Sequence, residues 1–287
     1  MLMASLAFST MSAFVKITGS EIPAYEKVFF RSFISVIVLA FLVKRNKLKF
    51  FGKRKHQKAL LFRSLLGTTA MSMFFYGIPH VHLADGAMIG KLNPFFVTLF
   101  AFIFLKEKLS KIQIPALILA FGAAALIIKP KWDIEMLPYL ALLGGAAFSA
   151  GGHTMLRALK SKEAPATIIF YFSLVTTLIL LPITILNFKT PQGIEWLYLL
   201  GIGIMAVIGQ LGLTYAYRCW LAAEISIYSY SGILFAGILG FFIFDEVPDW
   251  MSILGGLIII GVSLLVYFYK RRRRPLRNKR APKNVCE

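Results

Sequence analysis

Long apolar runs separated by short polar breaks fill most of this 287-residue chain. A membrane helix needs roughly 20 mostly apolar residues to cross about 30 Å of hydrocarbon. Because the longest connection between runs, residues 44–58, is short, a soluble catalytic domain does not fit between them. We therefore expect an all-α integral membrane protein. Its ten transmembrane helices are predicted near residues 1–18, 26–43, 59–79, 84–105, 111–129, 136–156, 165–186, 195–215, 224–244 and 250–269.

The first run, residues 1–18, could instead be a signal peptide. Signal peptides begin with a basic region, whereas Met1 leads directly into apolar sequence. We therefore interpret this run as the first span and expect a short or clipped amino terminus.

Composition supports a membrane protein and argues against a nucleic-acid partner. The chain is 58% hydrophobic and 16% charged, against about 45–50% and about 25% in soluble domains. Its formal charge of +19 could suit a nucleic-acid binder, but such a protein spreads basic residues over a polar face. Residues 84–105 contain almost none. The two cysteines, Cys219 and Cys286, form no metal-binding pattern, so neither a metal nor a cofactor is expected.

The basic residues instead indicate the orientation of the helices. Of the 32 Lys and Arg residues, 25 fall in alternate connections or in the carboxyl-terminal tail. Cytoplasmic loops of membrane proteins collect such residues, so both termini are predicted to be cytoplasmic and the protein to lie in the cell membrane. The tail, residues 271–287, is expected to anchor this topology and to bind anionic lipid headgroups.

An internal repeat appears when the chain is shifted against itself by 139–140 residues. Each half contains five spans, an odd number, so equivalent helices must cross in opposite directions. We expect a first repeat at 1–130, an inverted second repeat at 131–270 and then the tail. Inverted repeats are typical of secondary transporters, with the substrate site near the repeat interface. The paired positions are Ala7-Phe8-Ser9 with Ala147-Phe148-Ser149, Tyr76 with Tyr215, Asp85 with Glu224, Phe102 with Phe241, Glu107 with Glu246, and Gly122 with Gly261.

Short motifs in both halves resemble the EamA-type drug/metabolite transporter superfamily. The resemblance covers essentially the whole chain and implies a ten-helix transporter of small metabolites, without naming the substrate. Where that family places a proline in its ninth helix, this chain has Gly232 and Ile233, so any kink there must depend on glycine. The matching residues are Lys16, Pro23 and Arg31; Asn93-Pro94 with Phe104-Leu105-Lys106-Glu107-Lys108-Leu109; Phe244-Asp245-Glu246; and the stretch from Gly256 to Gly261-Val262.

A weaker similarity links the chain to S-adenosylmethionine uptake transporters. It is carried by residues 25–31 and 242–249. It implies a substrate such as an amino acid, a drug-like solute or an S-adenosylmethionine-like solute.

Ionisable side chains inside the predicted helices are the first candidates for substrate binding, because such groups usually face a cavity or a partner. Lys91 and Arg31 lie at similar depth from the outer face, where either could attract an anionic group. Alternatively, they pair with Asp85 or Glu26, or extend toward the interface.

Polar aromatic and amide residues form a second set. Gln210, Tyr228 and Tyr230 lie in the inner half of the predicted eighth and ninth helices. Their amphipathic side chains suit a pocket for a cationic or amphipathic metabolite. His153 is the remaining candidate for proton coupling, with a packing role as the alternative.

We predict a secondary transporter that works by alternating access as a monomer or homodimer. A channel or a lipid scramblase with the same fold is the main alternative. A membrane acyltransferase is a more remote one, because the spacing from His80 to Asp85 matches an H-x4-D motif. We do not expect an enzyme, since that motif lies in a short outer loop.

Overall fold

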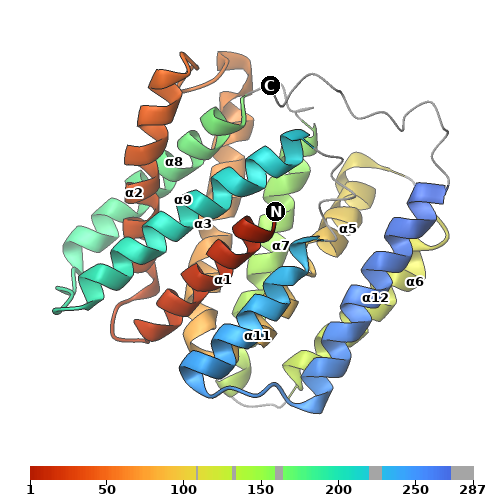
Figure 1. Ribbon diagram of the computed structural model, residues 1–287. Coiled ribbons are helices and arrows are strands. Elements are labelled where there is room, and N and C mark those ends of the chain that lie inside the picture. Colours follow the sequence, from red (N-terminus) through yellow and green to blue (C-terminus); the bar gives the residue numbers. More distant parts are fainter. Residues whose placement is uncertain (108, 131–133, 159–163, 220–227, 273–287) are drawn as a thin grey trace.

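The computed structural model describes residues 1–107, 109–130, 134–158, 164–219 and 228–272 (Figure 1). Within these residues the secondary structure is helical, with no strand, as the sequence predicts. The predicted tail and Glu224 lie largely or wholly outside the described residues. The helices are α1 (Leu2–Ile17), α2 (Ala24–Arg45), α3 (Gln57–Gly77), α4 (Leu83–Gly90), α5 (Asn93–Leu105), α6 (Gln113–Ile128), α7 (Leu137–Ala158), α8 (Pro165–Leu186), α9 (Glu195–Cys219), α11 (Ser231–Phe244) and α12 (Trp250–Arg272).

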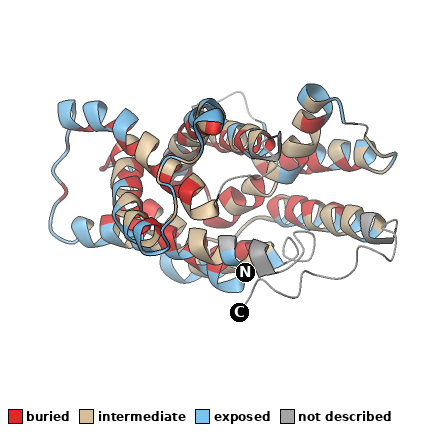
Figure 2. Cartoon of the chain, turned by 90° about the horizontal axis from the view of Figure 1, so that it is seen from above, coloured by how far each residue is buried: buried red, intermediate tan, exposed pale blue. Residues whose placement is uncertain are grey.

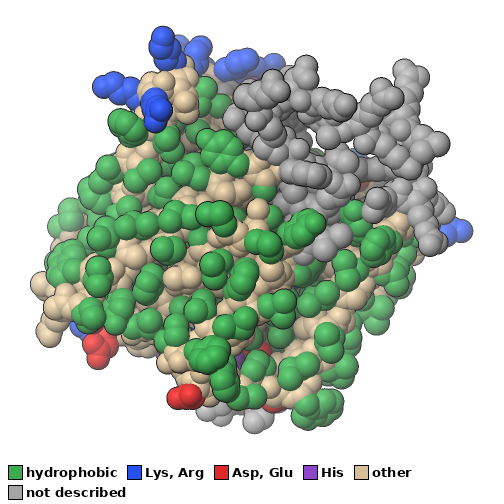
Figure 3. Space-filling view, in the orientation of Figure 1, with side chains coloured by type: hydrophobic (Ala, Val, Ile, Leu, Met, Phe, Trp, Pro, Cys, Tyr) green, Lys and Arg blue, Asp and Glu red, His purple; other side chains and the backbone are tan. Residues whose placement is uncertain are grey.

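The bundle carries apolar side chains on its outside as well as inside. Among the described residues, five helical segments are long and apolar enough to cross a membrane, and α1, α6 and α11 are shorter apolar helices. Large side chains such as Phe41, Ile118 and Phe242 are exposed, and exposed residues occur along the outer helices (Figure 2). Hydrophobic side chains cover much of the face seen in Figure 3. This surface suits a bilayer rather than water.

The fourth predicted span is divided, because α4 ends at Gly90 and α5 begins at Asn93. The span predicted at 84–105 is confirmed as a candidate membrane span, Leu83–Leu105, but it consists of two helices rather than one. Pro94 lies in the first turn of α5, where its missing N–H and fixed φ cost little. In an uninterrupted helix the same proline would remove a backbone hydrogen bond.

The ninth predicted span is interrupted at the corresponding place. Residues 228 and 229 are helical, Tyr230 is a turn, and α11 begins at Ser231. The Ile233 amide donates to the Tyr230 carbonyl at 2.9 Å. Tyr230 lies 139 residues after Lys91, which caps α4, so the two breaks coincide under the shift that aligns the halves.

The helices after the two breaks also end alike. Lys106 after α5 and Asp245 after α11 both adopt left-handed backbone, with φ of 52° and 53°. The next amide then returns to the helix, to the Ala101 carbonyl at 3.2 Å in one case and the Gly240 carbonyl at 3.1 Å in the other. Each bond spans six residues, one more than the 6→1 bond of a Schellman cap, and both caps form without glycine.

Helix packing follows the same exchange of halves. Helix α1 packs against α9 and α11, just as α7 packs against α3 and α5, while α2 packs against α8 and α6 against α12. Helices α1 and α7 run in opposite directions along the bundle (Figure 1). Visible Lys and Arg side chains gather mainly at the upper end of the view, and visible Asp and Glu at the lower end (Figure 3).

Candidate functional site

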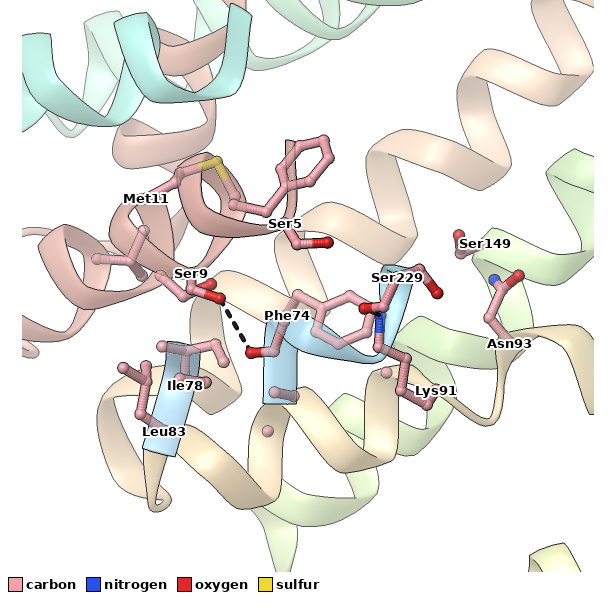
Figure 4. A pocket seen from close by; sticks show the side chains of 18 of the residues that line it. Ser5, Ser9, Met11, Phe74, Ile78, Leu83, Lys91, Asn93, Ser149 and Ser229 are labelled. Carbon is pink, nitrogen blue, oxygen red and sulfur yellow. Dashed lines mark hydrogen bonds between the residues drawn. The ribbon is translucent and has the colours of Figure 1, made fainter. Parts of the chain in front are cut away.

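A cavity of about 420 Å³ lies among α1, α3, α4, α7 and α11 (Figure 4). Its wall is mostly apolar, with Met, Phe, Leu and Ile side chains from several helices. A few polar groups converge on it, as in many sites for small organic molecules. The polar lining residues are Ser5, Ser9, Ser12, Lys91, Asn93, Ser149, His153 and Ser229.

Lys91 reaches the cavity because α4 stops there. Its backbone caps the helix, and its side chain extends toward the second broken span (Figure 4). The ammonium Nζ donates to the Ser229 carbonyl at 2.6 Å and lies 5.7 Å from the centre of the Tyr230 ring. One cation therefore joins the two interrupted spans, held by a carbonyl dipole and an aromatic face.

The beginning of α11 is also bound to α1. Ser9 Oγ donates to the Gly232 carbonyl at 3.0 Å. A Cβ added at Gly232 would lie 3.8 Å from Lys91 Nζ and 3.7 Å from Ser5 Cβ. Glycine at position 232 thus leaves space for the Lys91 side chain. The Gly232 backbone does not have a positive φ that would require glycine.

Toward the end of the bundle that is rich in basic side chains, Asn93 and His153 line the cavity together. His153 Nδ1 and Asn93 Oδ1 are 3.2 Å apart, and Asn93 Nδ2 donates to the Ala146 carbonyl at 3.3 Å. The His153 side chain remains exposed although it lines the cavity.

At the other end, near the lining residue Leu83, four residues form what we call the Glu246 cluster: Lys16, Val81, Leu83 and Glu246. The Glu246 carboxylate accepts from the Leu83 amide at 2.8 Å and pairs with the Lys16 ammonium. Lys16 also donates to the Val81 carbonyl. The cluster therefore joins α1, the start of α4 and the end of α11, and it places an anion at the positive end of the α4 dipole.

Sequence reasoning placed Lys16 and Glu246 in separate motifs and missed their contact. Lys16 belongs to the motif with Pro23 and Arg31, and Glu246 belongs to the motif Phe244-Asp245-Glu246. Their separation along the chain leaves no local pattern that pairs them, so only their opposite charge at predicted ends of spans could have suggested it.

Four other predicted site residues, Arg31, Gln210, Tyr228 and Tyr230, are not among the described residues that line this cavity. Arg31 is 1% exposed and lies on α2, with its guanidinium 5.9 Å from the Phe172 ring centre. Gln210 lies half-buried on α9. Tyr228 is 56% exposed. The Tyr230 ring lies beside the Lys91 ammonium, and the substrate-binding roles of all four residues remain predictions.

The residues of the H-x4-D motif do not pair with each other. His80 Nε2 lies 3.5 Å from Ser20 Oγ, whereas the Asp85 carboxylate lies 3.9 Å from His82 Nδ1. Among the described residues no three His, Cys, Asp or Glu side chains gather closely enough to hold a metal ion.

Comparisons with known proteins agree with a transporter. The pseudopaline exporter of Pseudomonas aeruginosa is 33% identical to this chain, over 90% of this chain and 91% of the exporter. The S-adenosylmethionine uptake transporter of Rickettsia felis is 26% identical, over 94% of this chain and 91% of its own length. A crystal structure that is 15% identical matches the fold with a TM-score of 0.63, covering 95% of this chain and 99% of its own.

The EamA-like transporter family matches the chain twice, over residues 1–129 and 136–268. The two matches nearly coincide with the halves that the 139–140-residue shift aligns, and the names of the relatives indicate transporters rather than enzymes. The chain therefore belongs to the EamA-like transporter family, a family of multi-pass membrane proteins.

Proposed function

We propose that this protein is a secondary transporter that moves a small organic metabolite across the cell membrane by alternating access, with the substrate in the central cavity. One observation carries the proposal: the Lys91 ammonium lies in the cavity and joins both interrupted spans. Interrupted helices at matching positions of two repeats mark the substrate site in many transporters. Lys91 would bind a carboxylate or another anionic group of an amino acid, a drug-like solute or an S-adenosylmethionine-like solute.

The arrangement of the halves supports movement of one against the other. Residues 1–130 and 131–270 would be inverted repeats, with 271–287 as a basic tail. Exchanging the halves maps the α1–α9 contact onto α7–α3 and the α1–α11 contact onto α7–α5. A fold with such internal exchange can close either end of the cavity by equivalent contacts, which is the basis of alternating access.

The closed end of the cavity supports an inward-facing conformation. The Glu246 cluster joins α1, α4 and α11 beside Leu83, while the exposed His153 lies toward the end rich in basic side chains. By the distribution of Lys and Arg, that end and both termini would be cytoplasmic.

Transport by Lys91 variants tests the proposal. A thermal-shift screen of the purified protein against metabolites, including amino acids and S-adenosylmethionine, would first identify a ligand. Saturable counterflow of that ligand in proteoliposomes should then be lost in Lys91→Met and kept in Lys44→Met, which removes an exposed lysine on α2. Unchanged affinity and rate in Lys91→Met would contradict the role of Lys91.

A channel or lipid scramblase is the competing function. Either would give flux that does not saturate with solute and shows no counterflow. The same proteoliposomes separate these outcomes, and reconstitution at low protein-to-lipid ratio shows whether the monomer or a homodimer transports.

His153 is a proposed proton-coupling residue, because its imidazole ring lines the cavity and is exposed, so that it can bind and release a proton there. His153→Gln keeps a hydrogen-bonding side chain without the ionisable ring. A transport rate that loses its pH dependence in this variant would support proton coupling, and an unchanged pH profile would remove His153 from it.

A further inference from the structure

Two arginines meet in the interior between α2, α3 and α8, outside the cavity lining. The Arg63 guanidinium lies 4.7 Å from the centre of the Phe172 ring, and the Arg31 guanidinium lies 5.9 Å from the same centre. An added Cβ at Gly67 would be 2.7 Å from Phe172 Cε2. The ring is therefore held closely against α3, with both cations near it.

The described residues leave several donors of this group unpartnered. Arg31 Nε and Nη1, Arg63 Nη1, and the hydroxyls of Ser32 and Ser173 are buried without a hydrogen-bond partner. Ser32 and Ser173 are 0% exposed and neighbour Arg31 and Phe172 in the chain. No ion pair within 4.0 Å joins either arginine to a carboxylate among the described residues. The cluster thus offers several donors and two positive charges to a ligand.

Such an arrangement is costly without an anion. A buried, unpaired charge loses several kcal/mol of solvation, and two like charges add repulsion. The aromatic face offsets only part of this cost for each cation. A single compact anion between the guanidinium groups would satisfy the donors and neutralise much of the charge, as Arg donors commonly do with carboxylates and oxyanions.

Arg63 is the more exposed of the two arginines. Arg63 is only partly buried, whereas Arg31 is 1% exposed. A Cβ added at Gly152 on α7 would lie 3.7 Å from Arg63 Cγ, and the next residue, His153, lines the central cavity. Arg63 therefore lies beside the part of α7 that borders the cavity.

We propose that Arg31 and Arg63 form a buried binding site for one compact anion beside Phe172. The ligand is a small inorganic anion or a carboxylate group. This site is separate from the Lys91 cavity, and the proposal does not depend on the direction or substrate of transport.

Thermal unfolding of the purified protein tests the site with defined anions. At constant ionic strength, replacing the bulky anion gluconate by chloride or acetate should raise the unfolding temperature saturably, by about 2–4 °C. A response to chloride alone indicates an inorganic anion, and a response to acetate alone indicates a carboxylate. No saturable response to chloride, acetate, nitrate or phosphate in the wild-type protein would overturn the proposal without any variant.

Variants locate the response. Arg63→Gln and Arg31→Gln should each abolish the anion-dependent shift, while Arg45→Gln, which removes an exposed arginine at the end of α2, should keep it. Arg63 is the first choice because partial exposure makes its replacement easier to fold. A full shift that persists in folded Arg63→Gln would also contradict the site.

Discussion

The two interrupted spans share a backbone design but differ in side-chain chemistry. The first breaks at Lys91 and the second at Tyr230, 139 residues later. The helices that follow end with the same left-handed cap, at Lys106 and Asp245. At the breaks themselves, one span contributes a cation and the other an aromatic ring and a carbonyl, and these contact each other.

The comparison indicates that the equivalent backbone breaks bring the two spans together. The different side chains at the breaks determine which groups contact each other there. Two identical spans would place two ammonium groups or two rings together at the interface, and like charges would repel. Because Lys91 faces Tyr230 and Ser229, the charge has complementary neighbours and can remain in the interior. The following variants change one half at a time.

The largest effect is expected from Lys91→Met in the first interrupted span. A hydrogen bond to a charged group contributes about 1.5–3 kcal/mol, so binding of an anionic substrate should weaken by about 10–100-fold. Tyr230→Phe, which retains the ring beside Lys91, should change affinity by less than about threefold. Equilibrium binding measured on both variants checks the comparison, and equal effects would show that the two breaks are not chemically distinct.

Glu246→Gln in the second half should have the next largest effect. The change removes the charge that holds Lys16 and weakens the bond from the Leu83 amide, at a cost of about 1–3 kcal/mol. The closed end should then open more often, so that a cysteine introduced at Leu83 in a background without native cysteines reacts faster with a membrane-impermeant thiol reagent.

Glu21→Gln is the control for that measurement, because Glu21 is exposed in the connection between α1 and α2. It should leave the labelling rate unchanged. Identical rates in Glu246→Gln and the parent would contradict a closing role for the Glu246 cluster.

A smaller effect is expected from Gly232→Ala at the start of α11. The added methyl group would lie at ordinary contact distance from Lys91 Nζ and Ser5 Cβ, so the fold should tolerate it while the cavity becomes smaller. The KM for transport should rise severalfold with little change in unfolding temperature. Gly237→Ala on the same helix, where an added Cβ meets nothing within 4 Å, should leave both unchanged.

The smallest effect concerns the caps of the helices that follow. Asp249 Oδ1 accepts from the Ser252 amide at 3.3 Å, while the corresponding Ser110 donates its hydroxyl to Gln113 Oε1 at 2.9 Å. The hydrogen bond from Lys129, 2.5 Å long, lowers the pKa of Asp249 to about 2. Because the folded-state pKa of Asp249 lies below its unfolded-state value, the ionised carboxylate stabilises the folded state above about pH 4. This stabilisation is lost as the pH falls toward about 2.

Asp249→Asn should therefore remove a small part of the acid sensitivity of unfolding between about pH 4 and 2. Ser110→Ala should lower stability equally at both pH values, since Ser110 does not titrate in this range. The effect of Asp249 is small because its side chain is 41% exposed, and solvent screens its ion pair. A pH profile identical to that of the parent would exclude this contribution.

The lengths of the apolar runs predicted the helical bundle well, because a span must be long and apolar wherever it lies. The same rule could not reveal the break at Lys91, since an interrupted span has nearly the composition of an intact one. Lys91 itself could be predicted as a candidate, because an ionisable group in an apolar run is conspicuous.

Arg31 shows the limit of that reasoning. Depth along a helix does not fix which side of the helix faces the cavity, and α2 turns this residue toward Phe172 on α8. The contact between Lys16 and Glu246 depends likewise on tertiary packing that brings α1 to the end of α11.

The bond from Lys91 to the Ser229 carbonyl makes ligand recognition an exchange of partners. Under the proposed function, an arriving carboxylate competes with a carbonyl that already occupies the ammonium, and the observed affinity is the difference between the two bonds. When Lys91 binds the carboxylate, its hydrogen bond to the Ser229 carbonyl breaks, and the two interrupted spans are no longer joined by that bond. A solute that lacks an anionic group could occupy the cavity and leave that hydrogen bond intact. The conformational change of the transporter, as well as binding, would then discriminate between solutes.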